Sequence, residues 1–93
     1  MNTDNRILVG NKPFMNYVTG VIMQFTTHDM SEVIIKSRGK FISRAVDVAE
    51  ISVSKFLKDL ILIKNICIDS ETFTNEEGKE IRVSTIEILL SKV

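Results

Sequence analysis

Twice in succession, a short apolar run ends near a glycine and is followed by a longer segment with helical spacing. The two units comprise residues 6–9, Gly10 and 13–26, and then residues 32–36, Gly39 and 40–56. Apolar runs of this length, bounded by turn residues, indicate buried strands. Two strand–helix units in a row predict a parallel strand pair joined by right-handed crossovers. This pattern limits the chain to an α/β fold.

Both helical segments carry their apolar residues on one face, which is typical of a helix that packs on a sheet. These residues are Phe14, Tyr17, Val18, Val21, Ile22 and Phe25 in the first segment, and Ile42, Ala45, Val46, Ala49, Val53 and Phe56 in the second. Pro13 fits a first helical turn, where its missing N–H is not needed. Gly20 costs a helix about 1 kcal/mol against alanine, so its presence indicates a close approach to the sheet or to a partner helix.

The C-terminal half predicts a hairpin of two long strands, residues 60–68 and 81–90. Asn75-Glu76-Glu77-Gly78 supplies the turn residues between them. The apolar alternation of the last strand changes phase around Ser84, which predicts a β-bulge there. The predicted fold class is α/β, a two-layer βαβαββ domain with a mixed four-stranded sheet, two helices and a projecting C-terminal β-hairpin. We expect one such domain over residues 1–93.

Positive charge is concentrated around the second glycine turn. Residues 33–44 contain no acid and four cations, Lys36, Arg38, Lys40 and Arg44. The whole chain balances twelve basic against twelve acidic residues, but residues 1–44 hold six basic and three acidic ones. Fixed cations at one sheet edge, beside the starts of helices, favour a polyanion such as a nucleic-acid backbone. The alternative is a solvated turn whose lysines keep the protein soluble.

The chain is poor in the groups from which an active site is built. His28 is the only histidine, and its polar surroundings predict an exposed turn residue. Cys67 is the only cysteine, and its apolar neighbours predict a buried thiol and a reducing compartment. A pair between these two residues stays open. The sequence has no metal-ligand spacing, and neither glycine turn matches a P-loop. We therefore expect no enzyme, no cofactor and no metal site.

Location and assembly can also be predicted. No apolar run reaches the roughly 20 residues of a bilayer span, and residues 1–5 show no secretory signal. We therefore expect a cytoplasmic or nucleoid protein without membrane contact. The two C-terminal strands hold more aliphatic residues than one face of a hairpin requires. This excess predicts that part of the surface meets a second copy of the chain, in a homodimer.

Four blocks of the sequence resemble the Alba family of archaeal chromatin proteins. In chain order they are residues 10–18 (GNKPFMNYV), 32–40 (EVIIKSRGK), 42–47 (ISRAVD) and 82–88 (RVSTIEI). The resemblance covers nearly the whole chain, in the order and spacing of the family. It implies a non-enzymatic homodimer that binds double-stranded DNA, and also RNA, largely without sequence preference.

The resemblance also implies which residues contact nucleic acid. On the body of the domain, meaning the sheet and helices without the projecting hairpin, the implied contacts are Lys12, Lys36, Arg38, Lys40 and Arg44. Asn16 and Tyr17 support the first turn. On the hairpin arm the implied contacts are Lys79 and Arg82. In the family the two arms reach along the minor groove. Phe56 matches an aromatic residue that some members use between neighbouring dimers. A core position at the end of the second helix is the open alternative for this residue.

Two departures from the family pattern weaken the expected binding. The family commonly has two lysines before the proline, the first a target of acetylation, and here that position is Asn11. Acetylation there is therefore excluded, and one backbone contact per subunit is lost. Residues 69–80 hold five acids against Lys79, so the arms suit phosphates poorly. We expect weaker and more salt-sensitive binding than is typical of the family.

Two rival functions remain from the sequence. The first is an RNA-binding role, as in the Alba-like subunits of the ribonuclease P ribonucleoprotein. The second is a protein-interaction module whose acidic hairpin docks on a basic partner.

Overall fold

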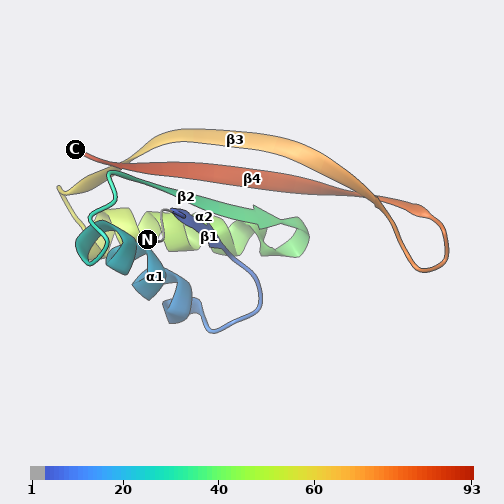
Figure 1. Ribbon diagram of the computed structural model, residues 1–93, viewed down its shortest axis with the longest axis horizontal. Helices are drawn as coiled ribbons and strands as arrows, with labels where there is room; N and C mark the ends of the chain where they lie inside the picture. Colours follow the sequence, from blue (N-terminus) through green and yellow to red (C-terminus); the bar gives the residue numbers. More distant parts are fainter. Residues whose placement is uncertain (1–3) are drawn as a thin grey trace.

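The computed structural model describes residues 4–93. Residues 1–3, which belong to the stretch 1–5 assessed for a secretory signal, lie outside the described residues. The elements in chain order are β1 (Arg6–Leu8), α1 (Phe14–Thr26), β2 (Glu32–Arg38), a 3-10 turn (Gly39–Phe41), α2 (Ile42–Ile51), a π-helical turn (Ser52–Phe56), β3 (Ile61–Thr74) and β4 (Glu80–Lys92). The four strands form one sheet in the order β1-β2-β4-β3. The pair β1–β2 is parallel, and the pairs β2–β4 and β3–β4 are antiparallel. The predicted βαβαββ fold with a mixed sheet is confirmed (Figure 1).

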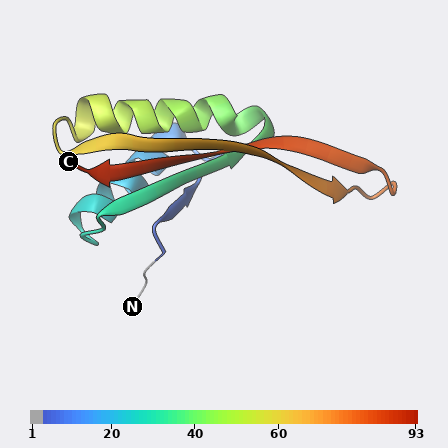
Figure 2. The same ribbon diagram turned by 90° about the horizontal axis from the view of Figure 1, so that it is seen from above.

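The helices pack on one face of the sheet, and we call the opposite face the open face. The β3–β4 hairpin continues past the helices and gives the molecule its length of 47 Å against 29 and 24 Å in the other directions (Figures 1 and 2). Pairing of β4 with β2 ends at Arg38↔Thr85. Beyond that point β3 and β4 pair only with each other. We call this part, residues 70–84, the arm.

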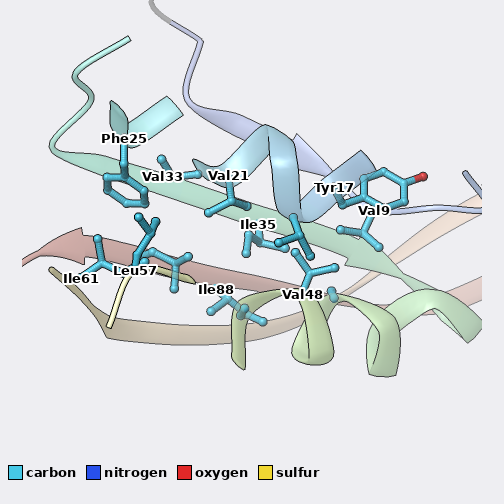
Figure 3. Packing of buried hydrophobic residues seen from close by; sticks show 14 of the residues in the cluster. Val9, Tyr17, Val21, Phe25, Val33, Ile35, Val48, Leu57, Ile61 and Ile88 are labelled. Atoms are coloured by element: carbon cyan, nitrogen blue, oxygen red, sulfur yellow. The ribbon is translucent and has the colours of Figure 1, made fainter. Parts of the chain in front are cut away.

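The hydrophobic core lies between the helices and the sheet (Figure 3). Its buried residues include Tyr17, Val18, Val21 and Phe25 of α1, Ala45, Val48 and Ala49 of α2, Val33 and Ile35 of β2, and Ile86, Ile88 and Leu90 of β4. The predicted apolar face of the first helix is confirmed. A Cβ added to Gly20 would lie 3.4 Å from Cδ1 of Ile7 in β1. The predicted close approach at this glycine is therefore an approach to the sheet.

The second helix only partly matches its predicted face: Ala45 and Ala49 are buried and Ile42 and Val53 pack against the core, as predicted. Its buried positions are Ala45, Val48, Ala49 and Ser52, a set with i, i+3, i+4, i+7 spacing. Val46 and Phe56, both predicted on the inner face, are exposed. Because the predicted face was drawn through Val46 and Phe56, it left out Val48 and Ser52, which are fully buried. The alternative of a core position for Phe56 is therefore wrong.

The β-bulge that was predicted near Ser84 of β4 lies instead in β3, the other strand of the hairpin. Ser84 pairs regularly with Ser70, and the register shift occurs in β3 between Ile63 and Asn65. The apolar alternation of β4 changes phase because adjacent residues are buried on opposite faces of the sheet. Ile86 is buried toward the helices, whereas its neighbour Thr85 is buried on the open face beside Arg38.

Cys67 is exposed, which contradicts the predicted buried thiol. It lies on β3, an edge strand of the sheet, opposite Glu87 on the open face. Alternation along an edge strand does not produce burial, because no helix covers this side. His28 is exposed in the connection between α1 and β2, as predicted.

Element boundaries differ from the predictions mainly at the hairpin. Both of its strands run further than residues 60–68 and 81–90, because the mostly polar residues 69–74 continue the β3 ladder. The turn at 75–78 is confirmed, with Gly78 at φ +78 and Asn75 Oδ1 accepting the N–H groups of Glu77 and Lys79. Among the described residues, no helix has the length and apolar character needed to cross a membrane.

Candidate nucleic-acid interface

The parallel pairing of β1 and β2 brings both glycine turns to the same end of the sheet. Leu8 pairs with Lys36, and the Val9 N–H donates to the Lys36 carbonyl at 2.9 Å. The turn after β1 therefore lies beside the turn after β2. Gly39 adopts φ +59, a left-handed conformation that glycine reaches without steric cost. Both turns stand at the base of the arm (Figure 1).

A cleft of about 580 Å³ opens at this end of the sheet. Its lining includes four cations, Arg6, Lys12, Lys36 and Arg38, and two acids, Asp4 and Glu71. Leu8, Tyr17 and Thr85 supply part of the remaining wall. A shallow cleft with several cations suits an extended polyanion, which can be held by its backbone rather than by an enclosed pocket.

Tyr17 and Arg44 fix the conformation of the first turn. Tyr17 is buried as a residue, and its hydroxyl accepts hydrogen bonds from the N–H groups of Gly10 and Lys12, both at 3.0 Å. The Arg44 guanidinium donates to the Gly10 carbonyl at 2.7 Å and lies 5.9 Å from the centre of the Tyr17 ring. The support that was predicted from Tyr17 is thus present in the structure. Arg44 has a structural role that its charge alone did not indicate.

Replacement of Tyr17 by phenylalanine tests this support. The variant leaves the N–H groups of Gly10 and Lys12 without their acceptor, so the free energy of unfolding should fall by about 1–3 kcal/mol. Urea denaturation followed by circular dichroism measures this change. The matched control Thr19→Ala removes an exposed hydroxyl from the same helix and should change the free energy by less than about 0.5 kcal/mol. Equal stability of Tyr17→Phe and the wild type would show that the hydroxyl does not support the turn.

Three of the cations near the cleft are paired with carboxylates. The distances are 3.4 Å for Lys36 Nζ to Glu87 Oε1, 3.4 Å for Arg38 Nη1 to Glu71 Oε2, and 3.3 Å for Arg6 Nε to Asp4 Oδ1. Hydrogen bonds from the Arg6 backbone N–H and guanidinium lower the pKa of Asp4, so this carboxylate keeps its charge beside the cleft. All these pairs are partly exposed to solvent.

Lys12 and Lys40 differ from the paired cations. Within residues 4–93, neither side chain forms an ion pair. Both are exposed, and the Lys40 ammonium lies 5.4 Å from the centre of the Phe41 ring. Lys12 lines the cleft, whereas Lys40 lies outside its lining.

The predicted arm residues lie apart from the body residues. Lys79 belongs to the turn at the tip, and Arg82 is paired with Thr72 across the arm. Both are exposed, and the tip also carries the exposed acids Glu76, Glu77 and Glu80. Asn16 is exposed on the first turn of α1. The fold therefore brings Lys12, Lys36 and Arg38 into one cleft and leaves the arm cations separate.

The residues that the sequence did not indicate are Arg6, Glu71 and Glu87. Glu87 is the register partner of Lys36, and Glu71 reaches Arg38 across β4. Only the strand register could have indicated the two glutamates, and the register could not be read from the sequence. Within the described part of the chain, no group of three or more potential metal ligands comes together.

Comparison with known proteins shows close relatives over the full length of the chain. The sequence model of the Alba family matches residues 5–70. A protein of Methanococcus maripaludis, named DNA/RNA-binding protein Alba, is 51% identical over 89 residues, which cover 96% of this chain and 99% of the relative. A protein of Methanothrix thermoacetophila with the same name is 51% identical over 92 residues, which cover 99% of this chain and 100% of the relative. The solved structure of Alba from Thermoplasma volcanium matches with a TM-score of 0.85 at 50% identity, covering 94% of this chain and 99% of that chain.

Proposed function

The chain belongs to the Alba family, and on that premise we propose that it is a nucleoid protein of the cytoplasm that binds double-stranded DNA largely without sequence preference. The observation that carries this proposal is the convergence of Lys12, Lys36 and Arg38 in one cleft at the base of the arm. The relatives' names, which include DNA/RNA-binding, support the same function. Family membership also supports the expectation that the chain is not an enzyme.

In this proposal the cations of the body hold the phosphates. Lys12 and Lys40 bind without displacing a partner, whereas Lys36 and Arg38 exchange a carboxylate for a phosphate. Tyr17 and Arg44 act indirectly, because they fix the turn that carries Lys12. Phosphate contacts set position and affinity but read no bases, which accounts for binding without sequence preference. The arm adds Lys79 and Arg82 along the groove, with a smaller contribution because of its acidic tip.

We further propose that the protein is a homodimer. Ile63, Ile66 and Ile68 are exposed on β3, and their partners across the ladder are the core residues Leu90, Ile88 and Ile86. The three isoleucines therefore share the helix side of the sheet but lie beyond the cover of the helices. The bulge at residue 64 keeps Ile63 on this side.

An apolar row on an edge strand favours a second copy of the chain as its partner. Exposed aliphatic surface of this kind is buried in interfaces. In a dimer with a two-fold axis, the row on one subunit packs against the same row on the other subunit. Val46 of α2 adds a further exposed apolar side chain on the helical layer. Phe56, also exposed, is left for a contact between neighbouring dimers.

The salt dependence of binding tests the proposal. A dimer that places about eight cations on phosphates should give a slope of log K against log salt near −7. Between 50 and 200 mM salt the affinity for a short duplex should then fall by about 10⁴-fold. Fluorescence anisotropy with a labelled duplex of mixed sequence measures this change. Affinity independent of salt would contradict a phosphate-based interface.

RNA is the second candidate ligand, because the names of the relatives include both nucleic acids. Phosphate contacts alone do not separate the two polymers. Competition of unlabelled duplex DNA, duplex RNA and a structured RNA against the same labelled duplex would rank them. Displacement at tenfold lower concentration by the structured RNA would favour the ribonucleoprotein role over the nucleoid role.

A further inference from the structure

Two cations of the cleft are held by carboxylates from other strands of the open face. Lys36 of β2 and Glu87 of β4 are direct register partners, with Nζ and Oε1 3.4 Å apart. Arg38 of β2 pairs with Glu71 of β3, although β4 lies between these strands. The register partner of Arg38 on β4 is Thr85, which is 6% exposed. The Arg38–Glu71 pair thus crosses β4 at this threonine.

We propose that Glu71 and Glu87 are built-in competitors for the phosphate groups of a bound nucleic acid. In the free protein they occupy Arg38 and Lys36, so each phosphate contact at these positions requires the exchange of one anion for another. The inference rests on the proposed function and adds the residues that limit its affinity.

The exposure of the pairs makes this exchange possible. The side chains of Lys36 and Glu87 are 35% and 47% exposed, and those of Arg38 and Glu71 are 66% and 44% exposed. Exposed ion pairs contribute little to stability, so the fold does not depend on them. A displaced carboxylate nevertheless remains beside the bound phosphate, and two like charges a few ångströms apart repel each other. Each glutamate therefore weakens binding twice, by occupying a cation and by opposing the phosphate.

The origin of the two carboxylates strengthens the inference. Both belong to the C-terminal hairpin, from the acidic half of the chain, and both approach cations of the basic half. The chain also has an ion pair that serves as an internal comparison. Lys64 Nζ and Glu32 Oε2 are 3.0 Å apart with exposures of 57% and 41%, and neither residue lines the cleft.

Isosteric substitution tests the competitors. Glu71→Gln and Glu87→Gln should each strengthen binding of a mixed-sequence duplex at 100 mM salt by about three- to ten-fold, since each removes one negative charge per subunit beside a phosphate. The double variant should show about the product of the two effects. Glu32→Gln, with the same change in net charge, should alter the affinity by less than about twofold.

The outcomes separate this inference from the proposed function. If the wild type binds but Glu71→Gln and Glu87→Gln behave like Glu32→Gln, the competitor role is wrong and the proposed function stands. Weaker binding by the glutamine variants would also overturn the inference, because it would show that the carboxylates position the cations. Absence of binding by the wild type and all variants at 50 mM salt would refute the proposed function itself, and the inference with it.

Discussion

Simultaneous replacement of Lys36, Arg38 and Lys40 by alanine is expected to nearly abolish nucleic-acid binding while the fold persists. The triple variant removes six cations from a dimer, and each phosphate contact is worth about one order of magnitude at 50 mM salt. It also leaves Glu71 and Glu87 unpaired beside the phosphates. We expect a loss of at least about 10³-fold in affinity and a salt slope reduced from near −7 to near −2. Anisotropy at 50 mM salt measures the loss, and circular dichroism checks the fold.

Two controls separate this local effect from a general change in charge. Replacing Lys55, Lys58 and Lys64 by alanine removes the same number of cations, but none of these residues lines the cleft. They follow α2 or begin β3, and β3 begins at the end of the molecule opposite the arm (Figure 1). That variant should lose less than about tenfold in affinity. Lys79→Ala should also cost far less than the triple variant, because Lys79 lies among acids at the tip of the arm. Equal losses for body and arm variants would mean that the arm carries the binding.

The sequence predicted the layout of the fold because its strongest signals are local. Each strand–turn–helix unit combines an apolar run, a glycine and a helical repeat within about 20 residues. These local patterns do not depend on contacts between distant parts of the chain. Parallel pairing then followed from the connections. The structure shows in addition that this pairing brings the two glycine turns together. The extent of the arm was underestimated because residues 69–74 are mostly polar. A two-stranded ribbon exposed on both faces needs no apolar alternation, so its pattern resembles that of a loop.

The electrostatics of the site were less predictable, because they depend on register between distant strands. Lys36 and Glu87 are 51 positions apart and meet only when β2 and β4 pair in one particular register. The family resemblance implies a phosphate contact for Arg44, which stays a prediction; the sequence did not indicate that its guanidinium also donates to the Gly10 carbonyl. The bulge was assigned to the wrong strand because a change of phase in β4 can also arise when adjacent residues are buried on opposite faces. The charge pattern thus indicated two cations that line the cleft, Lys36 and Arg38, but did not show that both are already paired.

Conversion of Ile66 to aspartate is expected to dissociate the proposed dimer. Ile66 is 55% exposed in the single chain and lies in the middle of the row formed with Ile63 and Ile68. In a two-fold interface the substitution acts twice, and each buried isoleucine side chain is worth about 1.5–3 kcal/mol. The dissociation constant of the dimer should therefore rise by about 10²- to 10⁴-fold. Sedimentation velocity over a range of protein concentrations measures this constant directly.

Leu8→Asp is the matched control for this prediction. Leu8 is 68% exposed, but it lies on the open face of β1, where no interface between copies is proposed. This variant should remain a dimer, which excludes a general effect of an added surface charge. Because a monomer presents half of the cations, Ile66→Asp should also reduce the salt slope of DNA binding from near −7 to near −4. A monomeric wild type, or an Ile66→Asp variant that dimerises as tightly as the wild type, would show that the isoleucine row is not the interface, and the full slope would then have to come from one chain alone.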